Sequence, residues 1–336
     1  MNRVYLDWNA TAPLRPEARA AMLAAMDCLG NPSSVHTEGR AAKAIVEKAR
    51  AQVAEAVGAS GADIVFTSSA TEASALALAE QGYFSSELEH NCVTVWTENE
   101  TRAASKTAQQ LANNETGEVY SVEPGTGFSD VVQAIGKIPY SFAWSGVERA
   151  MISSHKFGGP KGAGALVVKQ GIEVKAALKG GGQEMGWRAG TENVVGIAGM
   201  GAAAEAAAKD LADGVWLIVE QNRNVFEERL LNEVPELIIF GKDVMRLPNT
   251  SYFAVKGWKA ETQVMQMDLA GFAVSAGSAC SSGKVKASRV LKAMGYDEIT
   301  AGSAIRVSIG PSTTAAELDS FADAWLKEYK RYKARR

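Results

Sequence analysis

The chain has 336 residues and 46% of them are hydrophobic, so it can form two domains with a sizeable buried core. The formal net charge of −3 gives no basic surface for nucleic acid, and no stretch reaches the roughly 18 apolar residues of a membrane span. The start, MNRVYLDWNA, lacks the apolar core of a signal peptide, and the three cysteines are too widely spaced for a disulfide framework. We therefore expect a cytoplasmic protein.

The first part of the chain shows helical patterns and then a strand. Residues 14–58 have helical spacing with a break at GNPSS, and Cys28 lies in an apolar part of this stretch, where we expect it in the core. The run DIVFT predicts a strand, and Ser69 and Glu72 after it have the spacing of a capping box. A strand that passes into a helix through small residues is a common place for phosphate binding in α/β folds, because the helix N-terminus offers free N–H groups.

The middle of the chain continues this alternation. The run NCVTVW predicts a strand that carries Cys92, and the polar stretch 97–112 predicts a helix. Residues 149–169 predict two strands joined by a charged, glycine-rich loop, and 180–193 form a longer glycine-rich loop.

The last part of the chain begins with a strong helical pattern. Residues 194–233 are rich in alanine, with apolar residues at helical spacing. Shorter strand and helix patterns follow, and we place a change of domain near 240–250.

Two loops contain residues that point to chemistry. Lys156 in SSHKFGGPKG is either an ordinary surface charge or the Schiff-base lysine that pyridoxal phosphate chemistry needs. Lys161 competes for this role, but Ser153 and His155 lie beside Lys156 and supply phosphate ligands there. Cys280 in SAGSACSSG lies among small residues that are typical of a flexible loop, where a thiol is either accidental or reactive.

A series of motifs in this order resembles the cysteine desulfurases of the iron–sulfur-assembly type, in the class V aminotransferase group of fold-type I pyridoxal phosphate enzymes. The runs extend from residue 5 to residue 319, so they span nearly the whole chain. They are YLDWNATAP, GNPSSVH, FTSSATEA, EHNCV, NNETG, DVVQAIGKIP, SSHKFGGPKGAGAL, GGGQEMGWRAGTEN, LPNTS, AVSAGSACSSG, VLKAMG and IRVSIGPSTTAAELD.

The resemblance implies an α/β fold with a large mixed-sheet cofactor domain and a smaller α+β domain. The large domain would span 13–245, and the small domain, formed by 1–12 and 246–336, would carry the catalytic cysteine loop. The implied activity converts L-cysteine to L-alanine with pyridoxal phosphate and transfers the sulfur to an enzyme persulfide. The implied partners are a second copy of the chain and a sulfur-acceptor protein such as an iron–sulfur scaffold, and no metal is implied.

The resemblance also implies a role for individual residues. Lys156 would bind the cofactor covalently, and Cys280 would be the nucleophile that takes the sulfur. The other cofactor contacts would be Asp130 at the pyridine nitrogen, Gln133 at the ring hydroxyl, His90 stacked on the ring, and Thr71, Ser153, His155 and, from the neighbouring subunit, Thr191 at the phosphate. Asn114 and Arg306 would bind the substrate carboxylate.

The chain departs from the family pattern in a few places. The stretches from EHNCV to NNETG and from NNETG to DVVQ are short, which implies that part of the sheet or its covering helices is trimmed. Ser69 and Met185 stand where the family has glycine and arginine.

Two alternatives to the desulfurase remain open. One is a related pyridoxal phosphate enzyme: a selenocysteine or cysteine-sulfinate lyase, or an aminotransferase. The other is a non-catalytic paralogue that acts as a scaffold. The loop around Cys280 favours the desulfurase, and the retained Lys156 argues against the scaffold. The sulfur acceptor is not identified by any motif.

Overall fold

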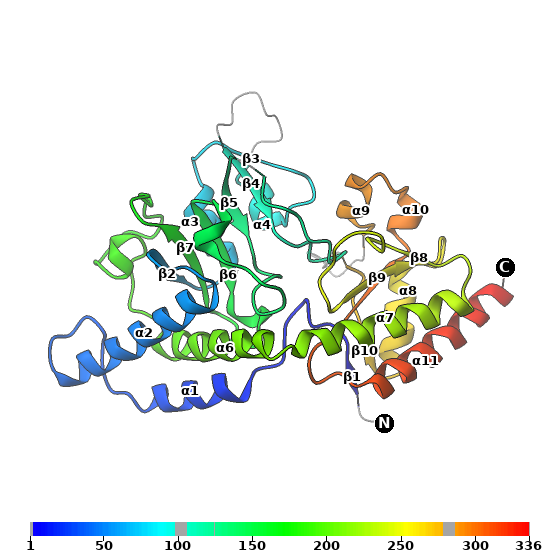
Figure 1. The fold of residues 1–336 in the computed structure, drawn as a ribbon, viewed down its shortest axis with the longest axis horizontal. Helices are drawn as coiled ribbons and strands as arrows, with labels where there is room; N and C mark the ends of the chain where they lie inside the picture. Colours follow the sequence, from blue (N-terminus) through cyan, green and yellow to red (C-terminus); the bar gives the residue numbers. More distant parts are fainter. Residues whose placement is uncertain (1–2, 98–105, 124, 278–285, 336) are drawn as a thin grey trace. The chain divides into compact units, whose positions relative to one another are not determined.

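The structure is a computed structural model that describes residues 3–97, 106–123, 125–277 and 286–335 (Figure 1). Its contacts divide the chain into two units. The six-stranded unit comprises 11–111 and 120–213, and the three-stranded unit comprises 1–10, 112–119 and 214–336. The sequence placed the boundary near 245, whereas the helix in 215–233 packs against the C-terminal helix of the three-stranded unit.

The six-stranded unit contains a mixed sheet, which is the architecture expected from the sequence. The outer strand β2 pairs with β7 in an antiparallel manner, and β7 pairs likewise with β6. The remaining pairs, β6 with β5, β5 with β4 and β4 with β3, are parallel. In spatial order, the strands are β2 (Ala62–Thr67), β7 (Gly164–Lys169), β6 (Arg149–Ser153), β5 (Thr126–Asp130), β4 (Lys106–Gln110) and β3 (Tyr83–Ser85).

Helices cover both faces of this sheet, and alternation along the strands explains the two cores. On β2, Ile64 and Phe66 contribute to one core and Val65 to the other, because successive strand side chains point to opposite faces. The first core includes residues of α1 (Pro16–Met26), α2 (Thr37–Ala56) and α6 (Val194–Ala212). The second includes residues of α3 (Ala70–Leu78) and the short α4 (Asn91–Thr94). Three further short helices in this unit are α5 (Phe142–Ser145), η1 (Ser154–Lys156) and η2 (Glu184–Gly186).

The helices α2 and α6 approach each other closely because small residues lie where they meet. A Cβ atom added at Gly201 of α6 would lie 2.6 Å from the Cα atom of Ala49 in α2. The alanine- and glycine-rich sequence of α6 therefore serves packing as well as helix formation.

The three-stranded unit is built around an antiparallel sheet with β9 (Thr250–Ala254) between β11 (Ala304–Ser308) and β8 (Ile238–Ile239). A separate parallel pair joins β1 (Val4–Tyr5) to β10 (Phe272–Ala273). Aromatic rings of Phe226, Phe253, Phe321 and Trp325 pack together in its core. The helices are α7 (Val215–Glu233), α8 (Ala260–Leu269), α9 (Arg289–Ala293), α10 (Glu298–Ala301) and α11 (Ala315–Ala334).

Three local predictions are wrong. The run NCVTVW forms the short helix α4, because His90 accepts a hydrogen bond from the Cys92 N–H and caps a helical turn. The stretch 97–112 contains strand β4 in its described part, because pairing with β3 and β5 outweighs the helical pattern. Cys28 lies just beyond the end of α1 and is half-buried rather than in the core.

The connection between β4 and β5 is short, as the sequence indicated, and this changes how the two strands are joined. Parallel neighbours are usually joined by a crossover that contains a helix, but 111–125, which joins β4 to β5, has no helix among its described residues. A bridge between Ala112 and Val119 organises this connection instead. In the part of the chain that the structure describes, no helix is both long and apolar enough to cross a membrane.

Candidate active site

The strand directions bring most of the candidate residues to one edge of the six-stranded sheet. Because β7 is antiparallel to both neighbours, β2 runs in the same direction as β6, and β5, β4 and β3 follow that direction. Asp130 ends β5, Ser153 ends β6, Thr71 follows β2 and His90 follows β3. The carboxyl ends of such strands are where open α/β sheets bind their ligands.

A glycine links the end of β6 to the start of α3. Ser153 pairs with Gly164, and a Cβ atom added at Gly164 would lie 2.7 Å from the carbonyl carbon of Ser69. Thr71 is exposed in the first turn of α3, where helix N–H groups have no intrahelical acceptors. Gly164 therefore brings the end of β6 near the N-terminus of α3.

The start of α3 is fixed by its own side chains, in partial agreement with the predicted capping box. The Ser69 hydroxyl accepts a hydrogen bond from the Glu72 N–H at 3.2 Å, as predicted. The Glu72 carboxylate, however, accepts from the Ser68 N–H at 2.7 Å and from Arg188 at 2.8 Å. Burial raises the pKa of Glu72, but the hydrogen bonds from Arg188 and Ser68 outweigh it and lower the pKa below its usual value.

Asp130 is a buried carboxylate at the end of β5. It is 8% exposed and accepts a hydrogen bond from the Val132 N–H at 2.9 Å. Burial raises the pKa of Asp130 to about 6, although the Val132 N–H and the charge of Lys156 act in the opposite direction. Among the described residues Asp130 forms no ion pair, so this carboxylate suits a cationic ligand atom such as a protonated pyridine nitrogen.

Gln133 lies one turn beyond Asp130 and is held by a buried lysine. The Lys137 ammonium donates to the Gln133 side-chain oxygen at 2.8 Å, and both side chains are buried. This bond fixes the orientation of the Gln133 side-chain amide, with its oxygen as an acceptor toward Lys137. Lys137 was not identified from the sequence; its spacing of four residues from Gln133 was the available signal.

Lys156 lies in η1, directly after β6, in the glycine-bordered loop that the sequence indicated. The Nδ1 atom of His155 is buried and has no hydrogen-bond partner among the described residues. Burial, with the charges of Lys156 and Lys161, lowers the pKa of His155 to about 4. The imidazole is therefore neutral near pH 7 and available to a ligand.

His90 has a defined tautomer. Its Nδ1 atom accepts a hydrogen bond from the Cys92 N–H at 3.2 Å and lies 2.9 Å from the Cys92 sulfur, so the ring proton of neutral His90 is on Nε2. Burial and the charge of Asp130 raise the pKa of Cys92 to about 12. Cys92 is thus a buried, protonated thiol and a poor nucleophile.

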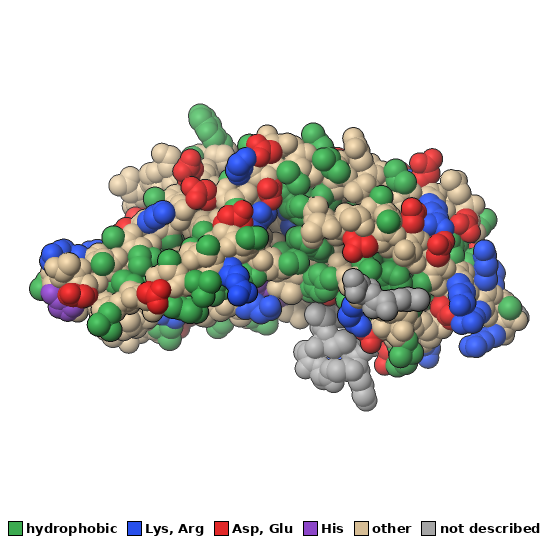
Figure 2. Space-filling view, turned by 90° about the horizontal axis from the view of Figure 1, so that it is seen from below, with side chains coloured by type: hydrophobic (Ala, Val, Ile, Leu, Met, Phe, Trp, Pro, Cys, Tyr) green, Lys and Arg blue, Asp and Glu red, His purple; other side chains and the backbone are tan. Residues whose placement is uncertain are grey.

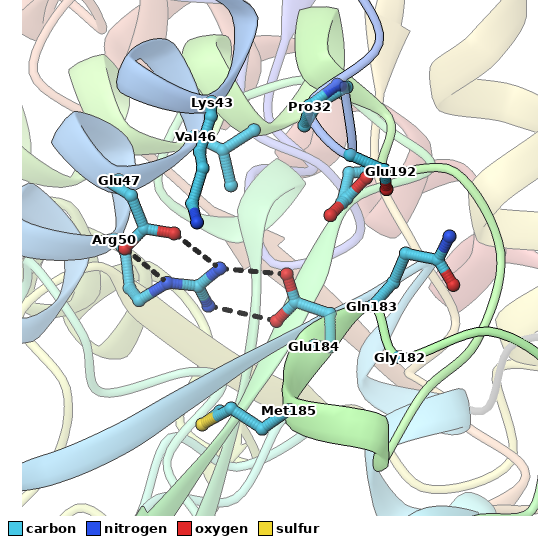
Figure 3. Close-up of a pocket in the computed structure, with 11 residues that line it drawn as sticks. Pro32, Lys43, Val46, Glu47, Arg50, Gly182, Gln183, Glu184, Met185 and Glu192 are labelled. Carbon is cyan, nitrogen blue, oxygen red and sulfur yellow. Dashed lines mark hydrogen bonds and ion pairs between the residues drawn. The ribbon is translucent and has the colours of Figure 1, made fainter. Parts of the chain in front are cut away.

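The glycine-rich loop before α6 is held against α2 and β2 by hydrogen bonds. Arg50 makes two hydrogen bonds of 2.9 Å to Glu184 (Figure 3). Glu184 also accepts a hydrogen bond from the Phe66 N–H at 2.8 Å. Arg50 and Glu184 border a cavity of about 440 Å³ into which Lys43 also extends. Thr191, further along the same loop, is exposed.

In the three-stranded unit, Arg306 and Asn114 lie in contact. Arg306 is 3% exposed in the middle of β11 and donates to the Asn114 carbonyl oxygen at 2.7 Å. It also pairs with Asp7 at 2.8 Å, a residue that the sequence analysis did not single out. The buried Nε atom of Arg306 has no hydrogen-bond partner among the described residues. Cys280 lies outside the described residues.

The residues present fit pyridoxal phosphate. A buried carboxylate that forms no ion pair among the described residues suits the pyridine nitrogen, and the start of α3, near the end of β6, suits the phosphate. Lys156 would provide the amine, and the Gln133 side-chain amide would contact the ring hydroxyl.

Comparisons with known proteins give the class first. The pattern of the aminotransferase class-V family matches residues 4–128 and 126–321. The chain belongs to this family of pyridoxal phosphate-dependent enzymes, and within it to the cysteine desulfurases. It is 37% identical to a cysteine desulfurase of Cereibacter sphaeroides over 366 positions, with 95% of this chain and 94% of that protein covered. It is 35% identical to one of Trichormus azollae, with 99% and 94% covered.

Solved structures agree with this assignment. A NifS-like protein from Rickettsia africae superposes with a TM-score of 0.89 at 30% identity, covering 98% of this chain and 100% of that one. The structure titled "SspA in complex with cysteine" has a TM-score of 0.75 at 26% identity, with 93% and 100% covered. The fold is therefore the fold-type I architecture expected from the motifs.

Proposed function

We propose that this enzyme converts L-cysteine to L-alanine and leaves the sulfur as a persulfide on Cys280. The observation that carries the proposal is the buried Asp130 carboxylate, whose pKa is influenced by Lys156, at the strand ends of a cysteine desulfurase fold. When bound, pyridoxal phosphate withdraws electrons from the α-carbon of the amino acid, which permits loss of the α-proton and release of the sulfur.

Asp130 and Lys156 have complementary roles in this proposal. Lys156 supplies the amine that attaches the cofactor, and Asp130 keeps a proton on the pyridine nitrogen by charge pairing. Gln133, held by Lys137, donates to the ring hydroxyl, and His90 stacks on the ring with its proton on Nε2. Thr71, Ser153 and His155 bind the phosphate.

Arg306 binds the carboxylate of the substrate together with Asn114. A guanidinium group holds a carboxylate through parallel hydrogen bonds, and Asp7 and the Asn114 carbonyl fix its plane. The buried, unpartnered Nε atom is one donor that a substrate carboxylate would satisfy.

Cys280 completes the reaction as a nucleophile. Its thiolate forms a bond to the substrate sulfur, the carbon–sulfur bond breaks, and the carbon takes up a proton to give alanine. Its small neighbours, serine, glycine and alanine, suit a thiol that must meet the substrate and then an acceptor. Cys92 does not compete, because its raised pKa keeps it protonated.

Two features of the six-stranded unit support a homodimer. Thr191 is exposed on its loop, where it is free to reach the phosphate of a partner subunit. Large apolar side chains are also exposed between residues 14 and 35, and Figure 2 shows hydrophobic surface over α1 and α2. The exposed residues are Leu14, Leu23, Met26, Leu29 and Val35.

The sulfur then passes to an acceptor protein, such as an iron–sulfur scaffold, in the cytoplasm. The NifS-like fold and the spacing of the cysteines support this placement.

One assay separates the proposal from its alternatives. The purified protein, loaded with pyridoxal phosphate, is given L-cysteine, and alanine and enzyme-bound sulfur are measured. Equal amounts of both support the desulfurase. Cofactor binding with turnover of only selenocysteine or cysteine sulfinate would favour the related lyases, and no cofactor binding would favour a scaffold.

A further inference from the structure

A buried carboxylate beside the substrate-binding segment has no role in the reaction described above. Glu115 follows Asn114 and is 6% exposed. Its Oε2 atom accepts hydrogen bonds from the Tyr252 hydroxyl at 3.2 Å and from the Ser288 hydroxyl at 2.5 Å. Tyr252 and Ser288 are themselves buried, so all members of this cluster are withdrawn from water.

The two hydroxyl groups lie at the flanks of the segment that carries Cys280. Ser288 follows this segment and caps α9 by accepting from the Leu291 N–H at 3.0 Å. Gly277 precedes it with φ +79°, and a Cβ atom added there would lie 2.5 Å from the Tyr252 hydroxyl oxygen. One carboxylate therefore connects the groups that contact both flanks.

The same cluster adjoins the residue proposed to bind the substrate carboxylate. Tyr252 lies directly opposite Arg306 in the pairing of β9 with β11. Ser275, just before Gly277, exchanges backbone hydrogen bonds of 3.1 and 2.7 Å with Arg306. The Arg306 side chain donates a hydrogen bond to the carbonyl oxygen of Asn114, the residue before Glu115.

We propose that Glu115 is a positioning residue for sulfur transfer: by accepting from Tyr252 and Ser288, it fixes both flanks of the Cys280 segment relative to Arg306. This inference rests on the proposed function. Fixing the described flanks sets where this segment begins and ends relative to Arg306, which favours the approach of the thiol to the substrate sulfur. Burial raises the pKa of Glu115, while the Ser288 hydrogen bond and the charges of Arg306 and Arg289 oppose this.

The test follows single turnover of the cofactor-loaded enzyme with L-cysteine. The absorbance change on mixing reports substrate binding, and quenched samples analysed by mass spectrometry report the persulfide on Cys280. We expect Glu115→Ala to slow persulfide formation by about tenfold or more, with the rate of the absorbance change within about twofold of wild type. Glu115→Gln keeps an acceptor oxygen and should restore most of the rate. Tyr252→Phe retains the ring and tests the cluster if Glu115→Ala does not fold.

Asp297→Asn is the matched control, because Asp297 caps the neighbouring helix α10 without touching the cluster, and it should behave as wild type. Wild-type persulfide rates in both Glu115→Ala and Tyr252→Phe would overturn the inference. A parallel loss of the absorbance change and the persulfide would also overturn it, since it would indicate a general loss of structure or binding. Failure of the wild type to form a persulfide would instead refute the proposed function.

Discussion

Asp130 and Lys156 influence each other across the ends of β5 and β6. Burial raises the pKa of the Asp130 carboxyl to about 6, and the positive charge of Lys156 opposes that rise. A carboxylate in this state gains from a cationic partner, which under the proposed function would be the pyridine nitrogen of the cofactor. The pair therefore links the stability of the cofactor-free protein to the binding of its cofactor.

The raised pKa of Asp130 predicts a pH-dependent loss of stability in the cofactor-free protein. A carboxyl with a raised folded pKa stabilises the fold at low pH, and this contribution is lost as pH rises from about 4 to about 6. At about 1.4 kcal/mol per pKa unit, the loss is at most about 3 kcal/mol. In Asp130→Asn, this loss of folding stability should be smaller, as measured by urea unfolding between about pH 4 and pH 6. Asp63→Asn is the control, and an identical pH profile for both variants would refute the prediction.

The same residue predicts a loss of activity in the loaded enzyme. Asp130→Ala removes the charge that holds the pyridine proton, so turnover should fall by about 100-fold or more while the fold is retained. Circular dichroism and steady-state alanine production check this. Near-native turnover would remove Asp130 from the mechanism.

Lys156→Ala should abolish covalent attachment of the cofactor. Borohydride reduction of the wild type, followed by peptide mapping, should place the label on Lys156. Lys161→Ala is the matched control from the same loop and should keep the label. A label on Lys161 in the wild type would show that the assignment is wrong.

The sequence supported the prediction of the strands and helices around the cofactor loop, because apolar runs and glycine-rich breaks are local signals. The apolar run NCVTVW predicted a strand instead of α4, because the hydrogen bond by which His90 caps this helix is not visible in the pattern of apolar residues. The Lys137–Gln133 and Asp7–Arg306 pairs were missed because buried polar partners depend on tertiary packing. Motif order suggested the proposed roles of Asn114 and Arg306, which are distant in sequence but in contact in the structure.

Arg306→Lys should raise KM for L-cysteine by about tenfold or more, because an ammonium group lacks the planar fork that grips a carboxylate. The fold-decrease in kcat of Arg306→Lys should be smaller than the fold-increase in KM. Arg306→Ala should also lower stability by about 3 kcal/mol, since it leaves Asp7 without its partner. Steady-state kinetics and thermal unfolding measure the two effects, and an unchanged KM in Arg306→Lys would contradict the role in substrate binding.

Light scattering should give the mass of a homodimer for the cofactor-loaded protein. Thr191→Ala should weaken phosphate binding in both sites by about tenfold, because a neutral hydroxyl bond to a phosphate contributes about 1.5 kcal/mol. A monomeric protein with fully bound cofactor would contradict the dimer and the role of Thr191.

The most direct test of the central claim is mass spectrometry of the wild type after treatment with L-cysteine alone. The account predicts one additional sulfur atom on Cys280 and none on Cys28 or Cys92, with Cys280→Ser still showing the cofactor's absorbance change but forming no persulfide. Added sulfur on Cys92, or full desulfurase turnover by Cys280→Ser, would contradict it.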